Sequence, residues 1–287
     1  MNAEVLGYLP GGEPKRPLVR WMGSKWRSAA WIISHMPPHR AYIEPYGGSG
    51  AVLLRKPEAR VEVLCDMDDE ILALYRVVRD PYLCGRLYLL CSMTRFSDAE
   101  YRVAMERLPL SSDPVERARR LIVRHAFQVS PDVRAETRAS GFRRHSSDRH
   151  CAAHDWNAYP EALGSLHARI RRVLIEHGDA VECMERHDRP DALHYCDPPY
   201  LPETRSDPRK GYSHELGIAG HERLLDCLVS LKGMVVVSGY ASALYDGRLG
   251  GWSKVTRKVK DHARKDRVEV LWINPAATAA ARQGNLF

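Results

Sequence analysis

A glycine-rich loop between two short apolar runs constrains the fold of this 287-residue chain more than any other feature. Residues 40–44 (RAYIE) have strand character and lead into 45–50 (PYGGSG), where glycines allow a tight turn into a following helix. A second alternating run, 60–65 (RVEVLC), stops at Asp66, and 70–78 is apolar at helical spacing. The order strand, loop, helix, strand, helix predicts an α/β fold with a Rossmann-like, parallel sheet and helices on both faces.

The middle of the chain has a different character. Helical stretches such as 115–129 alternate with polar segments, and 134–149 (RAETRASGFRRHSSDR) is rich in arginine, as in an exposed loop. The α/β pattern then returns, and further elements are expected as strands at 172–176, 192–196, 234–238 and 268–273 and as helices at 26–36 and 221–231. The expected organisation is a flexible lead-in (1–17), a discontinuous sheet domain (18–84 and 173–275), an inserted, mostly helical domain (85–172) and a C-terminal tail (276–287).

Composition bears on the partners and the compartment. The formal charge of +7, with a pI near 9.1, is compatible with nucleic acid, although many basic proteins bind nothing acidic. The seven cysteines lack CxxC and zinc-finger spacing, so we interpret them as free thiols in a cytoplasmic protein without a metal site. No signal-peptide pattern is present, and no apolar run approaches the roughly 20 residues that span a bilayer, so no membrane association is expected.

The loop 44–50 (EPYGGSG) is placed where open α/β sheets bind ligands, beyond the carboxyl end of a strand. Asp66 ends the next strand, and a carboxylate there can accept hydrogen bonds from both hydroxyls of a ribose. The loop has neither the GxGxxG nor the GxxxxGK[ST] pattern, so it disfavours nicotinamide dinucleotides and ATP. An adenosine-bearing ligand without phosphates, S-adenosylmethionine (SAM), fits better. The simpler alternative is a tight turn followed by a helix-capping aspartate.

The segment 193–201 (LHYCDPPYL) places an acid, two prolines and an aromatic ring directly after an apolar strand. The prolines lack amide hydrogens and end the strand, which leaves a carboxylate and a backbone carbonyl on a stiff loop. Two such acceptors, Asp197 and the carbonyl of Pro198, suit the exocyclic amine of a nucleobase, and Tyr200 would stack on a base that has been flipped out of its helix. The alternative interpretation is a strand terminator with a capping aspartate.

These motifs together resemble the Dam-like (D12 class, alpha group) DNA adenine-N6 methyltransferases. Residues 20–25 (RWMGSK) resemble the family's W-x-G-G-K segment with Ser24 in place of a glycine, and 44–50 resemble E-P-F-x-G-x-G with Tyr46 for phenylalanine. Residues 66–68 (DMD) resemble D-I-N, and 197–200 match D-P-P-Y in full. Residues 238–240 (SGY) and 269–274 (EVLWIN) resemble the family's later strands. The substitutions at Ser24 and Asp68 affect the hydrogen bonding expected there and not the class.

The resemblance implies roles at the matching positions. Trp21 and Lys25 would close over SAM, Asp66 would bind its ribose, and Asp179 would meet its adenine. The full expected set is catalytic Asp197, Pro198, Pro199 and Tyr200, and cofactor-binding Trp21, Gly23, Lys25, Glu44, Pro45, Tyr46, Gly47, Gly48, Gly50, Asp66, Asp179, Ala180 and Asp197. The competing interpretations are a packed tryptophan beside a solvated lysine, and a turn or helix cap at Asp179. The implied reaction is direct methyl transfer to adenine N6, with S-adenosylhomocysteine as product and no metal.

The resemblance implies double-stranded DNA as the partner and the inserted domain 85–172 as the target-recognition domain. The residues expected to contact it are Arg138, Phe142, Arg143, Arg144 and Arg149, and the alternative is a solvated arginine-rich loop packed by Phe142. The C-terminal residues 283–287 (QGNLF) faintly resemble peptides that dock on bacterial sliding clamps, although a frayed tail is the simpler interpretation. Cytosine-N4 methylation and a non-catalytic, SAM-retaining DNA-binding relative remain as alternative functions. The recognition sequence and the oligomeric state do not follow from the sequence.

Overall fold

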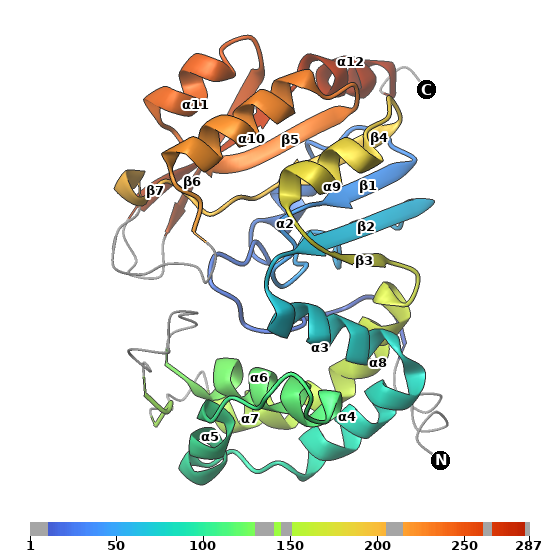
Figure 1. Cartoon of the computed structure of the whole chain (residues 1–287), viewed down its shortest axis with the longest axis vertical. Coiled ribbons are helices and arrows are strands. Elements are labelled where there is room, and N and C mark those ends of the chain that lie inside the picture. Colours follow the sequence, from blue (N-terminus) through green and yellow to red (C-terminus); the bar gives the residue numbers. More distant parts are fainter. Residues whose placement is uncertain (1–10, 130–140, 145–150, 205–214, 261–265, 285–287) are drawn as a thin grey trace. The chain divides into compact units, whose positions relative to one another are not determined.

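The computed structural model describes residues 11–129, 141–144, 151–204, 215–260 and 266–284 (Figure 1). The chain divides into two compact units, which we name the sheet unit and the helical unit. The sheet unit comprises the described residues within 28–47, 56–67 and 176–287, and the helical unit those within 1–27, 48–55 and 68–175. The chain passes between the units several times, and the loop 44–50 itself is divided after Gly47. The domain boundaries expected from the sequence stay a prediction.

A seven-stranded mixed sheet forms the centre of the sheet unit (Figure 1). In spatial order its strands are β3 (Leu174–His177), β2 (Val61–Asp66), β1 (Ala41–Glu44), β4 (Ala192–Cys196), β5 (Met234–Tyr240), β7 (Asp266–Ile273) and β6 (Ser253–Lys260). β1 pairs in parallel with β2 and β4, and β4 pairs in parallel with β5. β7 is antiparallel to both β5 and β6. The α/β fold is therefore confirmed, with an antiparallel addition at one edge that the parallel pattern did not predict.

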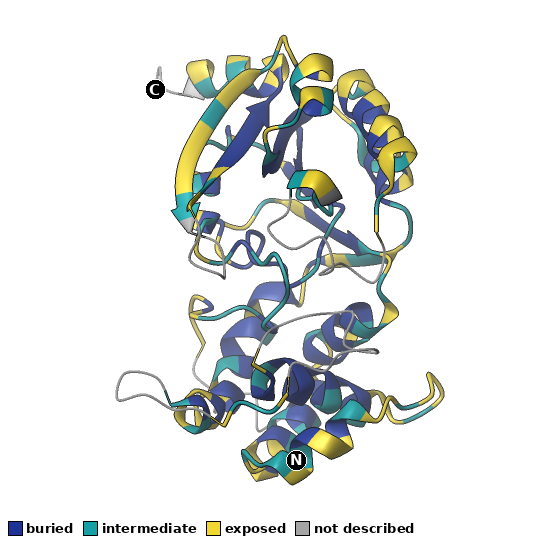
Figure 2. Ribbon diagram, turned by 90° about the vertical axis from the view of Figure 1, so that its left-hand side faces the viewer, coloured by how far each residue is buried: buried dark blue, intermediate teal, exposed yellow. Residues whose placement is uncertain are grey.

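Whether a strand could be recognised in the sequence depends on how deeply its residues are buried. β1 and β4 are buried at every residue, and such strands read as continuous apolar runs that are easy to recognise. β6 was not predicted, because its sequence (SKVTRKVK) is charged and the strand lies at the edge of the sheet, largely exposed (Figure 2). Lysines on an edge strand discourage pairing with other chains.

Helices pack on both faces of the sheet. They are α2 (Ala29–Ile33), α9 (Ala180–His187), α10 (Ile218–Ser230), α11 (Ala243–Arg248) and α12 (Pro275–Gly284), with a 3-10 turn at Pro202–Thr204. On β5, Val235 and Val237 join a core cluster with side chains of α9, α10 and α11. Alternate residues of a strand point to the opposite face. On β7, Val270 belongs to that cluster, whereas the neighbouring Glu269 accepts a hydrogen bond (2.8 Å) from Ser28, the N-cap residue of α2.

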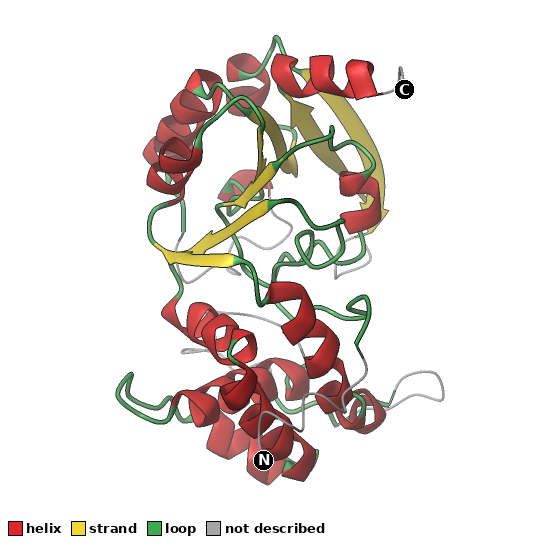
Figure 3. Cartoon of the chain, turned by 90° about the vertical axis from the view of Figure 1, so that its right-hand side faces the viewer, coloured by secondary structure: helices red, strands yellow, loops and turns green. Residues whose placement is uncertain are grey.

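The helical unit consists of short helices (Figure 3). They are α3 (Asp69–Arg79), α4 (Pro81–Met93), α5 (Asp98–Met105), α6 (Pro114–Phe127), α7 (Ala152–Asn157) and α8 (Tyr159–Ile170). Asp68, Asp80, Ser97 and Asp113 each accept a hydrogen bond from a backbone amide in the first turn that follows, which satisfies donors that a helix cannot satisfy itself. Among the described residues, no helix is long and apolar enough to cross a membrane.

Two helix predictions need correction. The helix expected after Gly50 is absent, and residues 51–55 form successive turns although Ala51 to Leu54 are buried. The apolar run is short, and Pro57 follows it closely, so there is no length over which a helix can propagate. The helix expected at 26–36 is limited to Ala29–Ile33.

Candidate active site at the strand ends

Asp197 lies directly after β4, at the carboxyl end of the parallel strands, as the sequence predicted. Its Oδ1 accepts a hydrogen bond of 2.8 Å from Oγ of Ser238, on the adjacent strand β5. Oγ of Ser238 also lies 3.0 Å from the hydroxyl of Tyr195. Since Tyr195 and Ser238 are both buried, this chain of hydrogen bonds orients the carboxylate from within the sheet.

The ring of Tyr200 stands edge-on to that of Tyr240, with ring centroids 4.8 Å apart and an interplanar angle of 67°. Both rings line a small cavity beside Pro198 and Gly239, with about 10 Å³ of space, enough for roughly one water molecule. Pro198 is buried and Pro199 is half-buried. The DPPY segment is therefore supported by the later strand, whose SGY residues supply one hydrogen-bond donor and one aromatic contact.

The part of the loop 44–50 that belongs to the sheet unit is tightly packed. Glu44 is buried, and its Oε2 accepts a hydrogen bond of 2.7 Å from the hydroxyl of Tyr42. Pro45 is buried as well. The amide of Gly47 donates to the carbonyl of Cys65 (2.8 Å), and a Cβ at Gly47 would come within 2.6 Å of a Leu64 methyl group, so any larger residue would force Leu64 to shift. Close approach of this loop to β2 is the physical reason for the glycine.

Tyr46 packs against the core cluster that includes Val181 and Cys196. Burial holds the pKa of Tyr46 well above that of an ordinary tyrosine, so its hydroxyl remains neutral. The side chain of Tyr46 thus anchors the loop 44–50 to a core that includes residues of α9 and the last residue of β4.

Asp66 ends β2, and its carbonyl accepts a hydrogen bond of 3.1 Å from the amide of Gly178. Asp179 follows and is the N-cap of α9, where its Oδ1 accepts from the amides of Val181 (3.0 Å) and Glu182 (3.1 Å). Its Oδ2 lies 2.9 Å from Nη1 of Arg223. Burial raises the pKa of Asp179, but the hydrogen bonds from Arg223 and the two amides outweigh it and lower the pKa overall. Asp179 is thus a helix cap, which was the alternative interpretation of this residue. Its role in cofactor binding stays a prediction.

The remaining motif residues belong to the helical unit. Gly23 has φ 74°, and the amide of Ser24 donates to the carbonyl of Trp21 (3.2 Å), so the W-M-G-S segment is a turn that needs a glycine. Lys25 is buried, and its Nζ donates to the carbonyl of Gly23 (2.9 Å). Lys25 is therefore not the solvated lysine of the alternative interpretation.

Gly48 and Gly50 also have positive φ, 45° and 59°. The indole ring of Trp21 lies 3.0 Å from where a Cβ of Gly48 would be. The same ring packs against His125 with centroids 5.1 Å apart. Burial lowers the pKa of His125 to about 3, so Trp21 rests on a neutral imidazole.

The structure describes three of the five expected DNA-contacting residues. Phe142 packs against Phe96 and Phe127, at centroid distances of 5.0 and 6.2 Å, as the alternative interpretation of a packed Phe142 expected. The backbone amide of Arg143 donates to the carbonyl of Phe127 (2.7 Å). Arg144 is exposed and lies 3.6 Å from Asp98. The predictions at Arg138 and Arg149 lie outside the described residues, as do three residues (285–287) of the predicted clamp-docking peptide.

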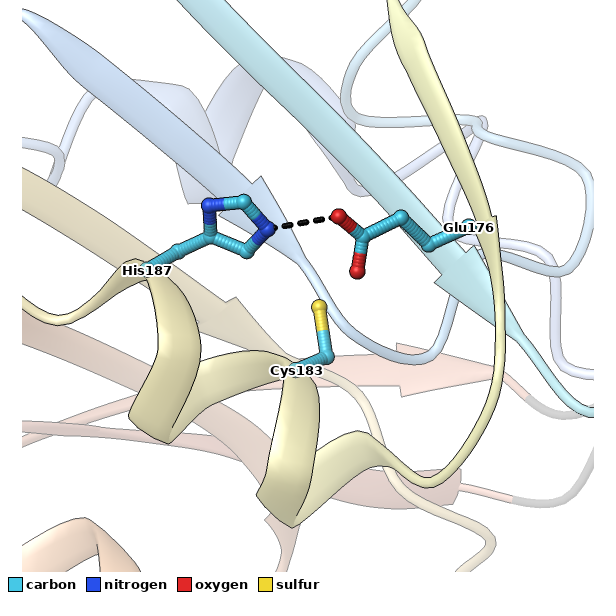
Figure 4. Close-up of side chains that lie close together, drawn as sticks. All are labelled: Glu176, Cys183 and His187. Carbon is cyan, nitrogen blue, oxygen red and sulfur yellow. Dashed lines mark hydrogen bonds and ion pairs between the residues drawn. The ribbon is translucent and has the colours of Figure 1, made fainter.

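The sequence analysis missed two groups of side chains. Ser238 and Tyr195 were seen only as strand residues, and nothing in the local pattern shows that they meet Asp197. Glu176, Cys183 and His187 lie close enough together to hold a metal ion, whereas no metal site was expected (Figure 4). The one available signal was the spacing of Cys183 and His187, which places them one helical turn apart.

Comparison with known proteins assigns the family. Residues 21–260 match the model of the D12 class N6 adenine-specific DNA methyltransferases. Over 270 residues the chain is 26% identical to a DNA adenine methylase of Haemophilus influenzae, covering 89% of this chain and 86% of the relative. Over 240 residues it is 24% identical to a DNA adenine methylase of Salmonella typhi, covering 80% and 82%.

Among solved structures, a putative RNA methyltransferase of Pyrococcus horikoshii is similar with a TM-score of 0.38 and 10% identity, over 94% of each chain. The family match extends over most of the sequence and includes each motif described above from Trp21 to the SGY residues of β5. The chain belongs to the D12 class of N6 adenine-specific DNA methyltransferases.

Proposed function

We propose that this chain methylates adenine N6 with Asp197, Pro198, Pro199 and Tyr200 as its catalytic residues. Membership of the family gives the activity, methylation of adenine in DNA with SAM as the methyl donor. The assignment to particular residues rests chiefly on one observation, the hydrogen bond of 2.8 Å from Ser238 to Asp197. A carboxylate oriented from inside the sheet, at the end of a central parallel strand, is suited to hold a substrate group in one position.

The chemistry of the strand-end residues fits SAM. Glu44 and Asp66 end the parallel strands β1 and β2, Asp197 directly follows β4, and Asp179 comes two residues after β3, so carboxylates gather at the ends of these strands. Carboxylates accept hydrogen bonds from ribose hydroxyls and attract an ammonium or sulfonium group, whereas they repel phosphates. We assign ribose binding to Asp66, and adenine binding to Asp179 and Ala180 at the start of α9. Glu44, Pro45, Tyr46 and Gly47 would complete the part of the site in the sheet unit.

From the motif alone, we assign Trp21, Gly23, Lys25, Gly48 and Gly50 to the same cofactor. Within the helical unit, Lys25 and the turn at Gly23 are held in one conformation by the hydrogen bond of 2.9 Å from Nζ to the carbonyl of Gly23. A hydroxyl contact of 2.8 Å between Ser24 and Ser49 joins this turn to the glycines of the loop 44–50.

Bound SAM supplies an activated methyl group, so the protein's main task is to position the acceptor nitrogen. The lone pair of adenine N6 is delocalised into the ring. Asp197 would accept a hydrogen bond from the amine, and the carbonyl of Pro198 a second one, which favours a pyramidal nitrogen. Tyr200 would stack on the flipped adenine. This mechanism uses no metal and yields S-adenosylhomocysteine.

The finer description of the DNA partner is also a proposal. We propose double-stranded DNA, from which the target adenine is flipped. Arg144 is the candidate for a phosphate contact that the structure favours, because its side chain is 71% exposed. Phe142 and Arg143 would support the segment, and Arg138 and Arg149 stay assigned by sequence alone. Docking of residues 283–287 on a sliding clamp would be shown by a pull-down that is lost on deletion of these residues.

Replacing Asp197 tests the catalytic assignment. Asp197→Ala is expected to lower the rate of N6-methyladenine formation at least about 100-fold, the lower end of what a positioned acid–base group contributes. Circular dichroism and the Kd for DNA should stay unchanged. Asp191→Asn is the matched control, since Asp191 precedes the same strand at its other end and pairs only with Arg189 at the surface. A D197A variant with rates close to those of D191N would refute the role of Asp197.

A further inference from the structure

Three side chains with metal-binding donors meet at one edge of the sheet unit (Figure 4). Glu176 lies on β3, and Cys183 and His187 lie on α9, four residues apart and therefore on one face of that helix. One donor atom from each lies within 4.8 Å of the other two. His187 Nε2 is already 2.7 Å from Oε1 of Glu176.

A second thiol adjoins this group. Cys65, in β2, belongs to the same core cluster as Cys183, and its Sγ lies 3.4 Å from the carbonyl of Gly178. Both cysteines are buried, each about 1% exposed, whereas Glu176 and His187 are half-buried. One thiol, an imidazole and a carboxylate thus converge from β3 and α9, and the thiol of Cys65 in β2 lies next to them, outside the group whose donor atoms are all within 4.8 Å of one another.

We propose that Glu176, Cys183 and His187 bind Zn²⁺, and that the side chain of Cys65 turns from the carbonyl of Gly178 toward the ion to become the fourth ligand. Thiolate, imidazole and carboxylate are the ligands that zinc takes in proteins, and four of them fill a tetrahedral, structural site. Ligand bonds of about 2.0–2.3 Å place neighbouring donor atoms roughly 3.4–3.8 Å apart in a tetrahedron. The separation of His187 and Glu176 would therefore widen by about 0.7 Å, a small rotation of two half-buried side chains.

The charges of the site balance closely. Both thiols must lose their protons to the solvent on binding, so two thiolates and one carboxylate surround a divalent cation and leave a net charge of −1. The guanidinium of Arg186 lies 2.6 Å from Oε2 of Glu176 and offsets this charge. Its side chain is 57% exposed, so it can stay beside the carboxylate without blocking the metal.

The position of the site gives it a consequence for the enzyme. Cys65 precedes Asp66, and Gly178 both accepts from the thiol of Cys65 and donates to the carbonyl of Asp66. Asp179, the next residue, begins α9. A zinc ion would fix the end of β2 against the start of α9, the two segments that carry the carboxylates assigned to SAM. This consequence rests on the proposed function, whereas the existence of the metal site does not.

Metal analysis of the full chain tests the site directly. The protein is incubated with excess ZnCl₂ under reducing conditions, dialysed and analysed by inductively coupled plasma mass spectrometry. We expect about one zinc per chain, and a melting temperature several degrees above that of protein treated with a chelator. A zinc content near zero together with identical melting temperatures would overturn the proposal, whatever the methylation activity of the sample.

Cobalt substitution identifies the ligands. Co²⁺ bound in place of zinc should give thiolate-to-metal charge-transfer absorption, which Cys183→Ala should abolish. Cys227→Ala is the control, because Cys227 is another buried free thiol but lies on α10 and outside the group. His187→Gln is a second test that remains usable if C183A does not fold, because His187 is only half-buried. This variant should bind zinc at least about 100-fold more weakly. Equal cobalt spectra of C183A and C227A, or a Cys65–Cys183 disulfide in place of metal under reducing conditions, would contradict the site.

Discussion

At the scale of single residues, the carboxylate of Asp197 is held by a side chain that lies outside the DPPY segment. Ser238 lies in the middle of a buried strand, donates to Asp197 and contacts the hydroxyl of Tyr195. A hydrogen bond to a charged group contributes about 1.5–3 kcal/mol when the partner has no water to replace it. In the proposed mechanism Ser238 is therefore a positioning residue, which would act on the reaction through the carboxylate of Asp197.

Ser238→Ala should lower kcat about 10-fold or more, since each 1.4 kcal/mol lost from the transition state is a factor of ten. The KM for SAM should change little, because the side chain does not belong to the assigned cofactor residues. Single-turnover methylation measures the effect. Ser230→Ala, which removes a hydroxyl that bonds only a carbonyl at the end of α10, is the control. A kcat unchanged in S238A would remove Ser238 from the mechanism.

Gly47 is a second residue whose identity has a steric cause. An alanine there would bring its Cβ to 2.6 Å from Leu64 and 3.1 Å from the Cys65 carbonyl, so Gly47→Ala should lower the free energy of unfolding by about 1–3 kcal/mol. Urea denaturation measures the loss. Gly247→Ala, in α11 with nothing near the added Cβ, should be neutral or stabilising. Similar losses in both variants would show that the loop can relax around the methyl group.

At the scale of elements, a strand or helix could be predicted where its own residues show by their apolar pattern which side chains are buried. β4 was predicted with its bounds intact, because every residue is buried and two prolines end it. β6 was missed, since a charged edge strand lacks that pattern. The predicted residues of the DPPY segment likewise follow a strand end. The hydrogen bond from Ser238 to Asp197, and the packing of Cys65 with Cys183 in one core cluster, join segments that only the folded chain brings together, so spacing along the sequence does not reveal them.

β4 also buries a histidine, which makes stability depend on pH. His194 is fully buried, and burial lowers its pKa to about 4, although Asp188 lies 3.5 Å from Nε2 and opposes the shift. An unfolded histidine has a pKa of about 6.5. Below that pH the unfolded chain binds a proton that the folded chain does not, so this contribution to stability is lost as the pH falls from 6.5 toward 4.

Between pH 7 and 5, His194 should account for about 2 kcal/mol of lost stability. In His194→Gln the free energy of unfolding should therefore decrease less over this range, as measured by urea titration at each pH. His154→Gln serves as the control, since His154 is exposed on α7. If H194Q and the wild type lose the same free energy of unfolding, the imidazole is protonated in the fold.

At the scale of the whole molecule, the net charge of +7 does not translate directly into a DNA-binding surface. Several arginines of α6 form ion pairs with glutamates inside the helical unit. Arg117 and Arg124 both pair with Glu70 of α3, and Arg119 pairs with Glu116 and Glu100. These side chains are about 10% exposed or less, so they stabilise the helical unit and are poorly placed to meet phosphates. Contacts with DNA phosphates therefore require basic side chains that remain at the surface.

Salt dependence separates such arginines from the others. The logarithm of the DNA association constant should fall linearly with the logarithm of salt concentration, with a slope of about −0.9 for each phosphate contacted. Arg144→Ala should make this slope shallower by about one and weaken binding at low salt, whatever the DNA sequence. Fluorescence anisotropy over a salt series measures both. Arg102→Ala is the matched control, because Arg102 is 76% exposed and pairs with the same Asp98 as Arg144. Equal slopes in R144A and R102A would mean that Arg144 contacts no phosphate, and that its ion pair with Asp98 is its whole role.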